Sequence, residues 1–211
     1  INLDINKGEI IALVGESGCG KTTLGRWMVD YFNIVGTKFI PDGDIHYHNN
    51  DTSYSILSEE YKKAFKVPPV QMIFQDPKTA LNLKMNIHDQ LIECLSQNKT
   101  DLDIQELSIK IAKKYKIAEY LDKTPQNISG GQRRRVGIAK IICCLNIIGD
   151  CNKVVIADEP VASLDASIKL DIMDRIIELN EEGYTIVIIS HDINLITRHA
   201  HRVIVMSKSR F

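Results

Sequence analysis

The stretch "GESGCGKTT" at residues 15–23 constrains the fold of this chain more than any other feature. The preceding "EIIALVG" is a continuous apolar run, typical of a buried parallel strand that ends at Gly15. The following "TTLGRWMVDYF" predicts a helix over residues 22–32. A strand, a glycine-rich turn and a helix in this order form a loop whose backbone N–H groups surround a phosphate. A chance turn is the alternative, but every motif position and the required context are present.

Each residue type in this loop has a role in binding a nucleotide. The glycines let the backbone wrap the β-phosphate, with the N–H groups of residues 18–22 pointing inward. Lys21 places a positive charge on the β- and γ-phosphate oxygens, and the Thr22 hydroxyl can ligate Mg²⁺. The expected nucleotide-binding residues are Gly15, Glu16, Ser17, Gly18, Cys19, Gly20, Lys21, Thr22 and Thr23. The expected ligands are therefore a nucleotide and Mg²⁺.

Alternating strands and helices predict the rest of the fold. Apolar runs predict strands at residues 70–74, 153–157, 185–190 and 202–207, and an alternating pattern at 43–49 predicts a half-exposed antiparallel strand. A helix over 167–183 ends with Gly183 at the C′ position, and the patterns from about 81 to 148 are helical. The prediction is an α/β fold with a mainly parallel sheet, covered on both faces, and an inserted helical segment.

Polar residues follow three of the predicted core strands. Asp158 ends the strand in "VVIADEP" and can reach Mg²⁺, through water, while Glu159 can polarise a water for attack on the γ-phosphate. A surface or helix-capping carboxylate is the alternative for Glu159. His191 follows another strand, where a γ-phosphate contact is favoured over a structural histidine because ligands bind at such strand ends. Gln75 ends "MIFQ" and offers a neutral carbonyl to Mg²⁺ or to the attacking water.

The stretch "NISGGQRRR" at residues 127–135 is a second candidate phosphate site. A serine and two glycines open onto a predicted helix, so backbone N–H groups there can bind an anion. The macrodipole disfavours the cations of Arg133, Arg134 and Arg135 in a first helical turn. We therefore expect either an anion or acidic surface supplied from outside, or a merely solvated basic face.

Composition excludes few classes of function. The formal net charge is −1, so nothing indicates nucleic-acid binding. Five cysteines follow no disulfide or zinc spacing, which indicates reduced thiols; we expect Cys143 and Cys144 to be small core residues that alkylate slowly. His46 and His48 are expected to be surface side chains rather than metal ligands. No apolar stretch is long enough to span a bilayer, and no signal peptide is evident.

The motifs together resemble those of the ABC ATPase family. "GESGCGKTT", "FQDP", "ISGGQ", "IADEP", "SLD" and "SHD" occur in the family's order between residues 15 and 192. The resemblance implies one domain over 1–211: a P-loop NTPase (RecA-like) core at about 1–78 and 149–211, carrying an antiparallel β part, and a helical subdomain at about 79–148. It also implies that two such domains, identical or different, pair head to tail around two ATP molecules. Ser129, Gly130, Gly131 and Gln132, with Asp165, would then contact the ATP held by the partner's loop. Asp165 alone would be read as an N-cap.

A narrower resemblance is to the oligopeptide/dipeptide/nickel branch of importer ATPases, through "VQMIFQDPKTALN" and "VVIADEPVASLDAS". It implies transmembrane permease subunits as partners, a solute-binding protein indirectly, and a place on the cytoplasmic face of the membrane. The chain departs from the family at Ile128, in place of leucine, and in the long segment 140–155. The family's adenine-stacking aromatic would precede Ile1, and a C-terminal extension is missing, so we expect a fragment truncated at both ends.

Two other functions are open at this point. One is a soluble ABC ATPase that acts on DNA, ribosomes or an enzyme assembly. The other is a structural module gated by nucleotide, against which Glu159 and His191 argue.

Overall fold

The computed structural model describes residues 1–38, 42–76, 80–96, 101–146, 151–162 and 164–207. Its internal contacts define two compact units. The first unit comprises Ile1–Met72, Asp150–Glu159 and Ile177–Phe211, and the second comprises Ile73–Gly149 and Pro160–Ile176. No helix in the described ranges has both the length and the apolar character needed to cross a membrane.

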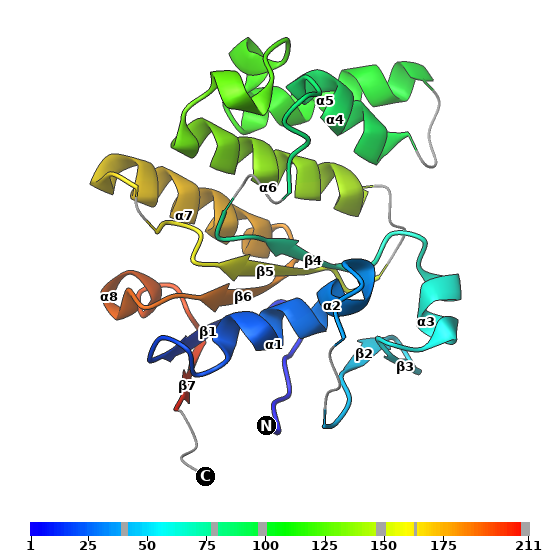
Figure 1. Ribbon diagram of the computed structural model, residues 1–211, viewed down its shortest axis with the longest axis vertical. Coiled ribbons are helices and arrows are strands. Elements are labelled where there is room, and N and C mark those ends of the chain that lie inside the picture. Colours follow the sequence, from blue (N-terminus) through cyan, green and yellow to red (C-terminus); the bar gives the residue numbers. More distant parts are fainter. Residues whose placement is uncertain (39–41, 77–79, 97–100, 147–150, 163, 208–211) are drawn as a thin grey trace. The chain divides into compact units, whose positions relative to one another are not determined.

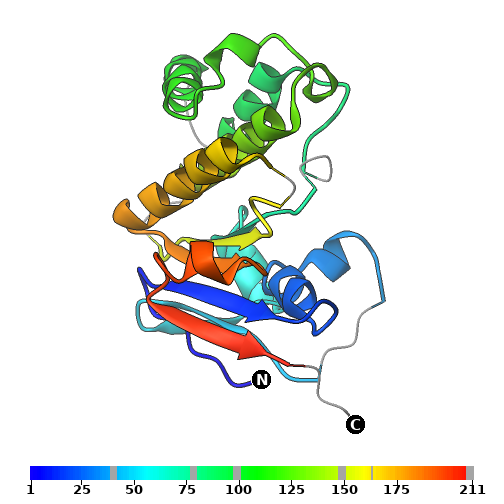
Figure 2. The ribbon, with the colours of Figure 1, turned by 90° about the vertical axis from the view of Figure 1, so that its left-hand side faces the viewer.

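A parallel sheet dominates the first unit. Among the described residues its strand order is β4 (Val70–Ile73), β5 (Val154–Asp158), β6 (Thr185–Ile189), β1 (Ile10–Gly15) and β7 (Arg202–Met206). β1 pairs in parallel with β6 and with β7, which lies beside it in Figure 2, and β5 pairs in parallel with β6. β1, β5 and β6 are buried along almost their whole length, as continuous apolar runs require. The predicted parallel sheet is confirmed.

Helix α1 (Lys21–Met28) packs closely on this sheet (Figure 1). Gly25 permits the approach, because a Cβ atom there would lie 2.8 Å from Ile189 Cδ1. The predicted helix over 22–32 is wrong in one respect. The helix is interrupted at Asp30, and a separate turn of helix, α2 (Tyr31–Ile34), follows. Asp30 has a φ of 54°, and this left-handed conformation cannot continue a right-handed helix.

The first unit also contains an antiparallel strand pair and a short helix. β2 (His46–Asn49) pairs with β3 (Thr52–Ser55), which confirms the predicted antiparallel strand, and His46 and His48 are exposed as expected. α3 (Glu59–Ala64) follows, with Ser58 accepting a hydrogen bond from the backbone N–H of Tyr61 as its N-cap. β3 and α3 were not predicted. Tyr47, Tyr61 and Phe65 pack their rings together and join the strand pair to the helix.

Helices make up the second unit. They are α4 (Ile87–Leu95), α5 (Asp101–Lys114), α6 (Gly130–Asn146) and the first part of α7 (Ala166–Glu181), with 3₁₀ turns at Ala118–Tyr120 and Pro125–Asn127. α6 packs against both α4 and α5 (Figure 1). The helical prediction for this region is therefore confirmed. The unit spans residues 73–149 and 160–176, and the predicted subdomain boundaries at about 79 and 148 stay a prediction.

Back in the first unit, α7 ends as predicted. The N–H of Gly183 bonds the carbonyl of Asn180, and the N–H of Tyr184 bonds that of Leu179, which is the hydrogen-bond pattern of a glycine C′ cap. The chain then enters β6, and α8 (Ile193–Ile196) lies between β6 and β7. This arrangement brings the carboxyl ends of β1, β5 and β6 to one edge of the sheet.

Candidate functional site

The phosphate loop joins β1 to α1 in the first unit. Gly20, the N-cap of α1, has a φ of 103° and makes no side-chain cap, so no side chain competes for the N–H groups of the first helical turn. Lys21 is 8% exposed, and its ammonium group donates hydrogen bonds to the carbonyls of Gly15 (2.8 Å) and Glu16 (2.9 Å). The loop therefore folds around a fixed cation and presents backbone donors, which suits a polyphosphate.

The two predicted Mg²⁺ ligands of this unit are in direct contact. The Thr22 hydroxyl donates a hydrogen bond of 3.0 Å to Oδ1 of Asp158, which is 1% exposed at the end of β5. Burial raises the pKa of Asp158, although the Thr22 hydrogen bond and the nearby Arg26 and Lys21 work in the opposite direction. A divalent cation would relieve this cost by stabilising the ionised carboxylate.

This donor set fits Mg²⁺. The ion usually takes one or two protein oxygens and completes its shell with phosphate and water. Within the described residues no group of three or more His, Cys, Asp or Glu side chains is arranged so that it could hold a metal ion.

Glu159 and His191 form a pair at the same edge of the sheet. Nδ1 of His191 lies 2.8 Å from Oε1 of Glu159, and an ionised carboxylate can only accept, so the imidazole donates this bond. Glu159 has a φ of 46°, and its backbone N–H bonds the carbonyl of Ile189. Strained backbone at a polar site often accompanies function. The side chain of Glu159 is 14% exposed and that of His191 is 75% exposed, so the pair can reach a ligand.

In the second unit, the "SGGQ" segment forms the N-terminus of α6. The Ser129 hydroxyl accepts from the backbone N–H of Gln132 (3.3 Å), and Oε1 of Gln132 accepts from the N–H of Ser129 (2.7 Å). This is a capping box, and the spacing S-x-x-Q was the signal that could have predicted it. Ser129 and Gly130 are exposed, whereas Gly131 is buried with its Cα facing Ile168. The exposed pair can present hydroxyl and backbone donors to an anion.

The three arginines that follow have partners inside this unit. Arg133 donates to the carbonyls of Pro125 and Ile128, and Arg134 donates to the carbonyls of Gln75 and Ala162. Nε of Arg135 lies 2.9 Å from Oδ2 of Asp171. The predicted solvated face is therefore wrong for Arg134, which is buried, and the external anion stays a prediction. The arginines connect α6 to neighbouring backbone and to α7.

Two more predicted residues belong to the second unit. The side chain of Gln75 is exposed, and its backbone carbonyl accepts the Arg134 bond of 2.7 Å. Asp165 immediately precedes α7, is exposed, and accepts a backbone bond from Lys169, which is consistent with an N-cap position. Their roles toward a nucleotide stay predictions.

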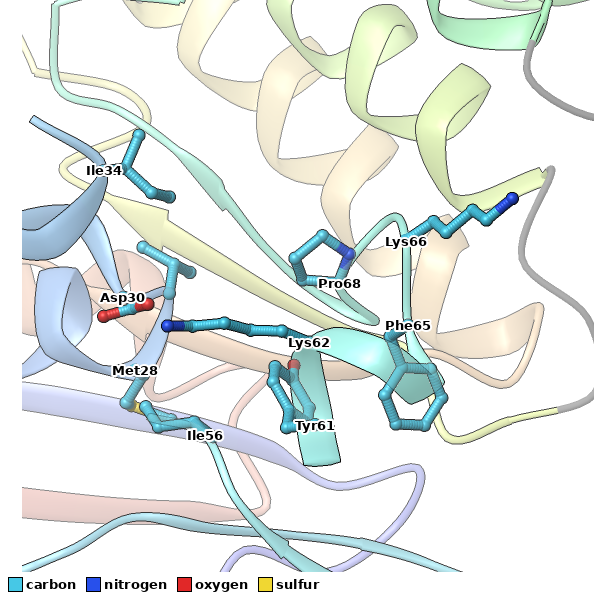
Figure 3. Close-up of a pocket in the computed structure, with 10 residues that line it drawn as sticks. Met28, Asp30, Ile34, Ile56, Tyr61, Lys62, Phe65, Lys66 and Pro68 are labelled. Carbon is cyan, nitrogen blue, oxygen red and sulfur yellow. The ribbon is translucent and has the colours of Figure 1, made fainter. Parts of the chain in front are cut away.

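The first unit also has a pocket that was not predicted. Its volume is about 240 Å³, and Figure 3 shows Met28, Asp30 and Ile34 on one side and Tyr61, Phe65 and Pro68 on the other. Lys62 and Lys66 add positive charge and Asp30 adds a carboxylate to a mostly apolar lining. None of the predicted nucleotide-binding residues lines this pocket.

Comparison with known sequences identifies the relatives of this chain. The profile of a family described as ABC transporter matches residues 1–162. The chain is 33% identical over 213 residues to the dipeptide transport ATP-binding protein DppF of Lactococcus lactis subsp. cremoris, covering 98% of the chain and 64% of that protein. It is 34% identical over 217 residues to the oligopeptide transport ATP-binding protein OppF of Streptococcus mutans, with the same two coverages. The chain thus spans 64% of the length of these two curated relatives.

Solved structures share the fold. The chain superposes with a TM-score of 0.77 on cbiO1 from Clostridium perfringens, described as part of the ABC transporter complex cbiONQ; the two are 28% identical over 100% of this chain and 78% of that one. The TM-score is also 0.77 for an ATP-binding cassette in a dimeric post-hydrolysis state bound to ADP and Pi, at 23% identity over 99% of this chain and 85% of that one. The predicted α/β P-loop fold is confirmed.

Proposed function

The chain belongs to the ABC transporter family, and we propose that it binds and hydrolyses ATP as the ATP-binding subunit of a membrane transporter that imports peptides or related small solutes. The observation that supports hydrolysis best is the convergence of the phosphate loop, the Thr22–Asp158 contact and the Glu159–His191 pair within one unit. Together these groups supply a phosphate cradle, a cation site and a base, which phosphoryl transfer to water requires.

In this proposal the loop residues 15–23 hold the phosphates, with Lys21 on the β- and γ-phosphate oxygens. Thr22 and Asp158 would hold Mg²⁺, with Asp158 bound through water, and the ion would supply neutralising charge for the phosphates. Glu159 accepts a hydrogen bond from the attacking water and directs a lone pair of the water oxygen toward the γ-phosphorus. His191 holds the Glu159 carboxylate and offers its exposed ring to the γ-phosphate.

The chain has two candidate phosphate-binding segments, residues 15–23 and the Ser129–Gln132 segment. We propose that Ser129, Gly130, Gly131, Gln132 and Asp165 contact the ATP held by residues 15–23 of a second ABC ATPase domain, identical or different. The capping box supports this, because it leaves Ser129 and Gly130 exposed at the N-terminus of a long helix.

ATP binding by the purified chain tests the enzyme assignment. We expect Lys21→Ala to weaken Mg-ATP binding at least about tenfold and to abolish hydrolysis, because it removes a charge-assisted bond to phosphate. The matched control is Lys38→Ala, an exposed lysine beyond α2 that should leave both unchanged. Equal binding by wild type and Lys21→Ala would contradict the proposed cradle.

The transport assignment rests on the relatives, whose names describe dipeptide and oligopeptide transport. It implies permease subunits in the membrane, a solute-binding protein indirectly, and a peripheral place on the cytoplasmic face. Affinity purification of the full-length native protein from a detergent extract tests it. Recovery of polytopic membrane subunits is the expected result. Recovery of ribosomes, DNA or a soluble enzyme assembly instead would favour the alternative class of ABC ATPase.

A further inference from the structure

Three thiols of the second unit lie where two helices meet. Cys94 is in the last turn of α4, and Cys143 and Cys144 are in the last turn of α6, which packs against α4 (Figure 1). All three are free cysteines. Cys143 is fully buried, as expected for a small core residue, and Cys94 is 8% exposed. Cys144 is only partly buried, so the sequence-based expectation of a core residue is wrong for this thiol.

Cys94 and Cys144 are in side-chain contact across this junction. The two thiols are close enough to share a side-chain hydrogen bond. This bond raises the pKa of Cys94, and burial raises it further. The same bond lowers the pKa of Cys144, helped by Lys140 one helical turn away, although burial acts against it. Cys144 is consequently the better nucleophile of the pair and Cys94 holds the proton.

The surroundings favour redox chemistry over metal binding. Among the described residues no group of three or more His, Cys, Asp or Glu side chains, these thiols included, is arranged so that it could hold a metal ion. Partial exposure gives a small reagent access to Cys144, whereas Cys94 is buried. A nucleophilic, accessible thiol beside a buried resolving thiol is the arrangement that forms disulfides by exchange.

We propose that Cys94 and Cys144 form a reversible disulfide that links α4 to α6 when the protein meets a small-molecule disulfide. The Cys144 thiolate attacks one sulfur of the reagent, the reagent's S–S bond breaks, and one thiolate leaves. Cys94 then loses its proton, its sulfur attacks the Cys144 sulfur, and the second thiolate leaves and is protonated. Two protein thiols are oxidised by two electrons, and one molecule of disulfide is reduced to two thiols.

Peptide mapping of the unaltered chain tests this proposal. The protein is incubated with oxidised glutathione, its remaining thiols are blocked with N-ethylmaleimide, and it is digested with trypsin without reductant. We expect peptide 85–99 joined to peptide 141–153. Apart from N-ethylmaleimide on the other thiols, the linked species should be two hydrogen atoms lighter than the sum of the two peptides. Fragment ions should place the bond at Cys144. A reductant should separate the two peptides.

Matched variants separate the three cysteines of peptide 141–153. Cys144→Ala should abolish the linked peptide, while Cys143→Ala and Cys151→Ala should keep its yield within about twofold, because neither takes part in the exchange. Cys94→Ala should stop the reaction at its first step and accumulate a glutathione adduct on Cys144. Cys144→Ala should form no adduct on Cys94.

Three results would overturn the proposal. The first is that wild type forms no linked peptide while Cys19 forms a glutathione adduct. The second is a disulfide from Cys94 to Cys143 or Cys151 as often as to Cys144. The third is a glutathione adduct that forms first on Cys94. The wild-type measurement needs no substitution, so a variant that fails to fold does not affect it.

Discussion

The bond between His191 and Glu159 predicts that the two residues act as one functional unit. Glu159→Gln removes the proposed base, and the loss of a general base typically lowers the rate about 10²–10⁴-fold. His191→Ala removes a hydrogen bond of 2.8 Å to the carboxylate. A charge-assisted bond in a buried place contributes about 1.5–3 kcal/mol. His191 is 75% exposed, however, and solvent reduces the contribution to about 1 kcal/mol, or roughly fivefold in rate.

This magnitude sets the outcome of a double-mutant cycle. Orientation by His191 accelerates the reaction only when residue 159 is a base, so the fivefold contribution disappears in the Glu159→Gln background. We expect the double variant to be roughly fivefold more active than the product of the two single effects would give. Any direct contact of His191 with phosphate persists in both backgrounds and cancels from the comparison.

Single-turnover hydrolysis of radiolabelled ATP under excess enzyme can follow rates this slow. The control is His48→Ala, which removes an exposed histidine on β2 and should match wild type. If the rate of the double variant matched the product of the two single effects within a factor of about two, there would be no coupling. That result would refute the idea that the His191–Glu159 bond orients the base.

Three further predictions follow from the site. Mg-ATP should slow the alkylation of Cys19, which lies inside the phosphate loop, as measured by mass spectrometry. Cys143 is 0% exposed and should react slowly with or without nucleotide. A labelling rate of Cys19 that is the same with and without Mg-ATP would contradict the loop assignment. Ser129→Ala should lower stability by about 1 kcal/mol through loss of the capping box, and Ser167→Ala, exposed on α7, is its control in urea titrations; equal midpoints would refute the cap. The pKa of Asp158 is raised, so this carboxyl binds a proton more readily than an ordinary one. The affinity for Mg-ATP, measured by calorimetry, should therefore fall as the pH is lowered toward that pKa. A pH profile identical to that of Asp158→Asn would contradict this.

The sequence predicted the parts of the fold that depend on local pattern and strand ends. Apolar runs of β1, β5 and β6 predicted buried parallel strands, and the side chains placed at their carboxyl ends do meet: Thr22 contacts Asp158, and Glu159 contacts His191. The glycine at the end of α7 also predicted the cap that forms there. These features require no knowledge of distant partners.

Features decided by distant contacts were missed. Arg134 and Arg135 were read as facing outward, because their carbonyl and carboxylate partners lie 28 to 59 residues away in the chain. The break at Asp30 also had no local breaker, since "VDYF" continues the helical pattern. The contact of Cys94 with Cys144 depends on the packing of α4 on α6, which spacing along the chain does not reveal.

The central claim is that each ATP is held by two chains, and complementation between defective chains tests it. One chain carries Lys21→Ala. The other carries Gly130→Asp, which places a carboxylate against the γ-phosphate. Gly130 is a better target than Gly131, because a side chain at 130 would meet nothing within 4 Å, whereas a Cβ at 131 would lie 3.0 Å from Ile168 Cγ2.

Each variant should be inactive alone. In a mixed dimer one site carries both lesions, and the other combines the intact Lys21 of one chain with the intact Ser129–Gly131 segment of the other. We therefore expect ATP hydrolysis to return on mixing, to about a quarter of wild type for random pairing in a two-fold dimer. Should the natural partner be a different ABC subunit, the same pair of lesions is divided between the two proteins. Circular dichroism confirms that the chains are folded, and a tag on one chain confirms that the dimer is mixed. A folded, mixed dimer that hydrolyses no ATP would contradict the claim.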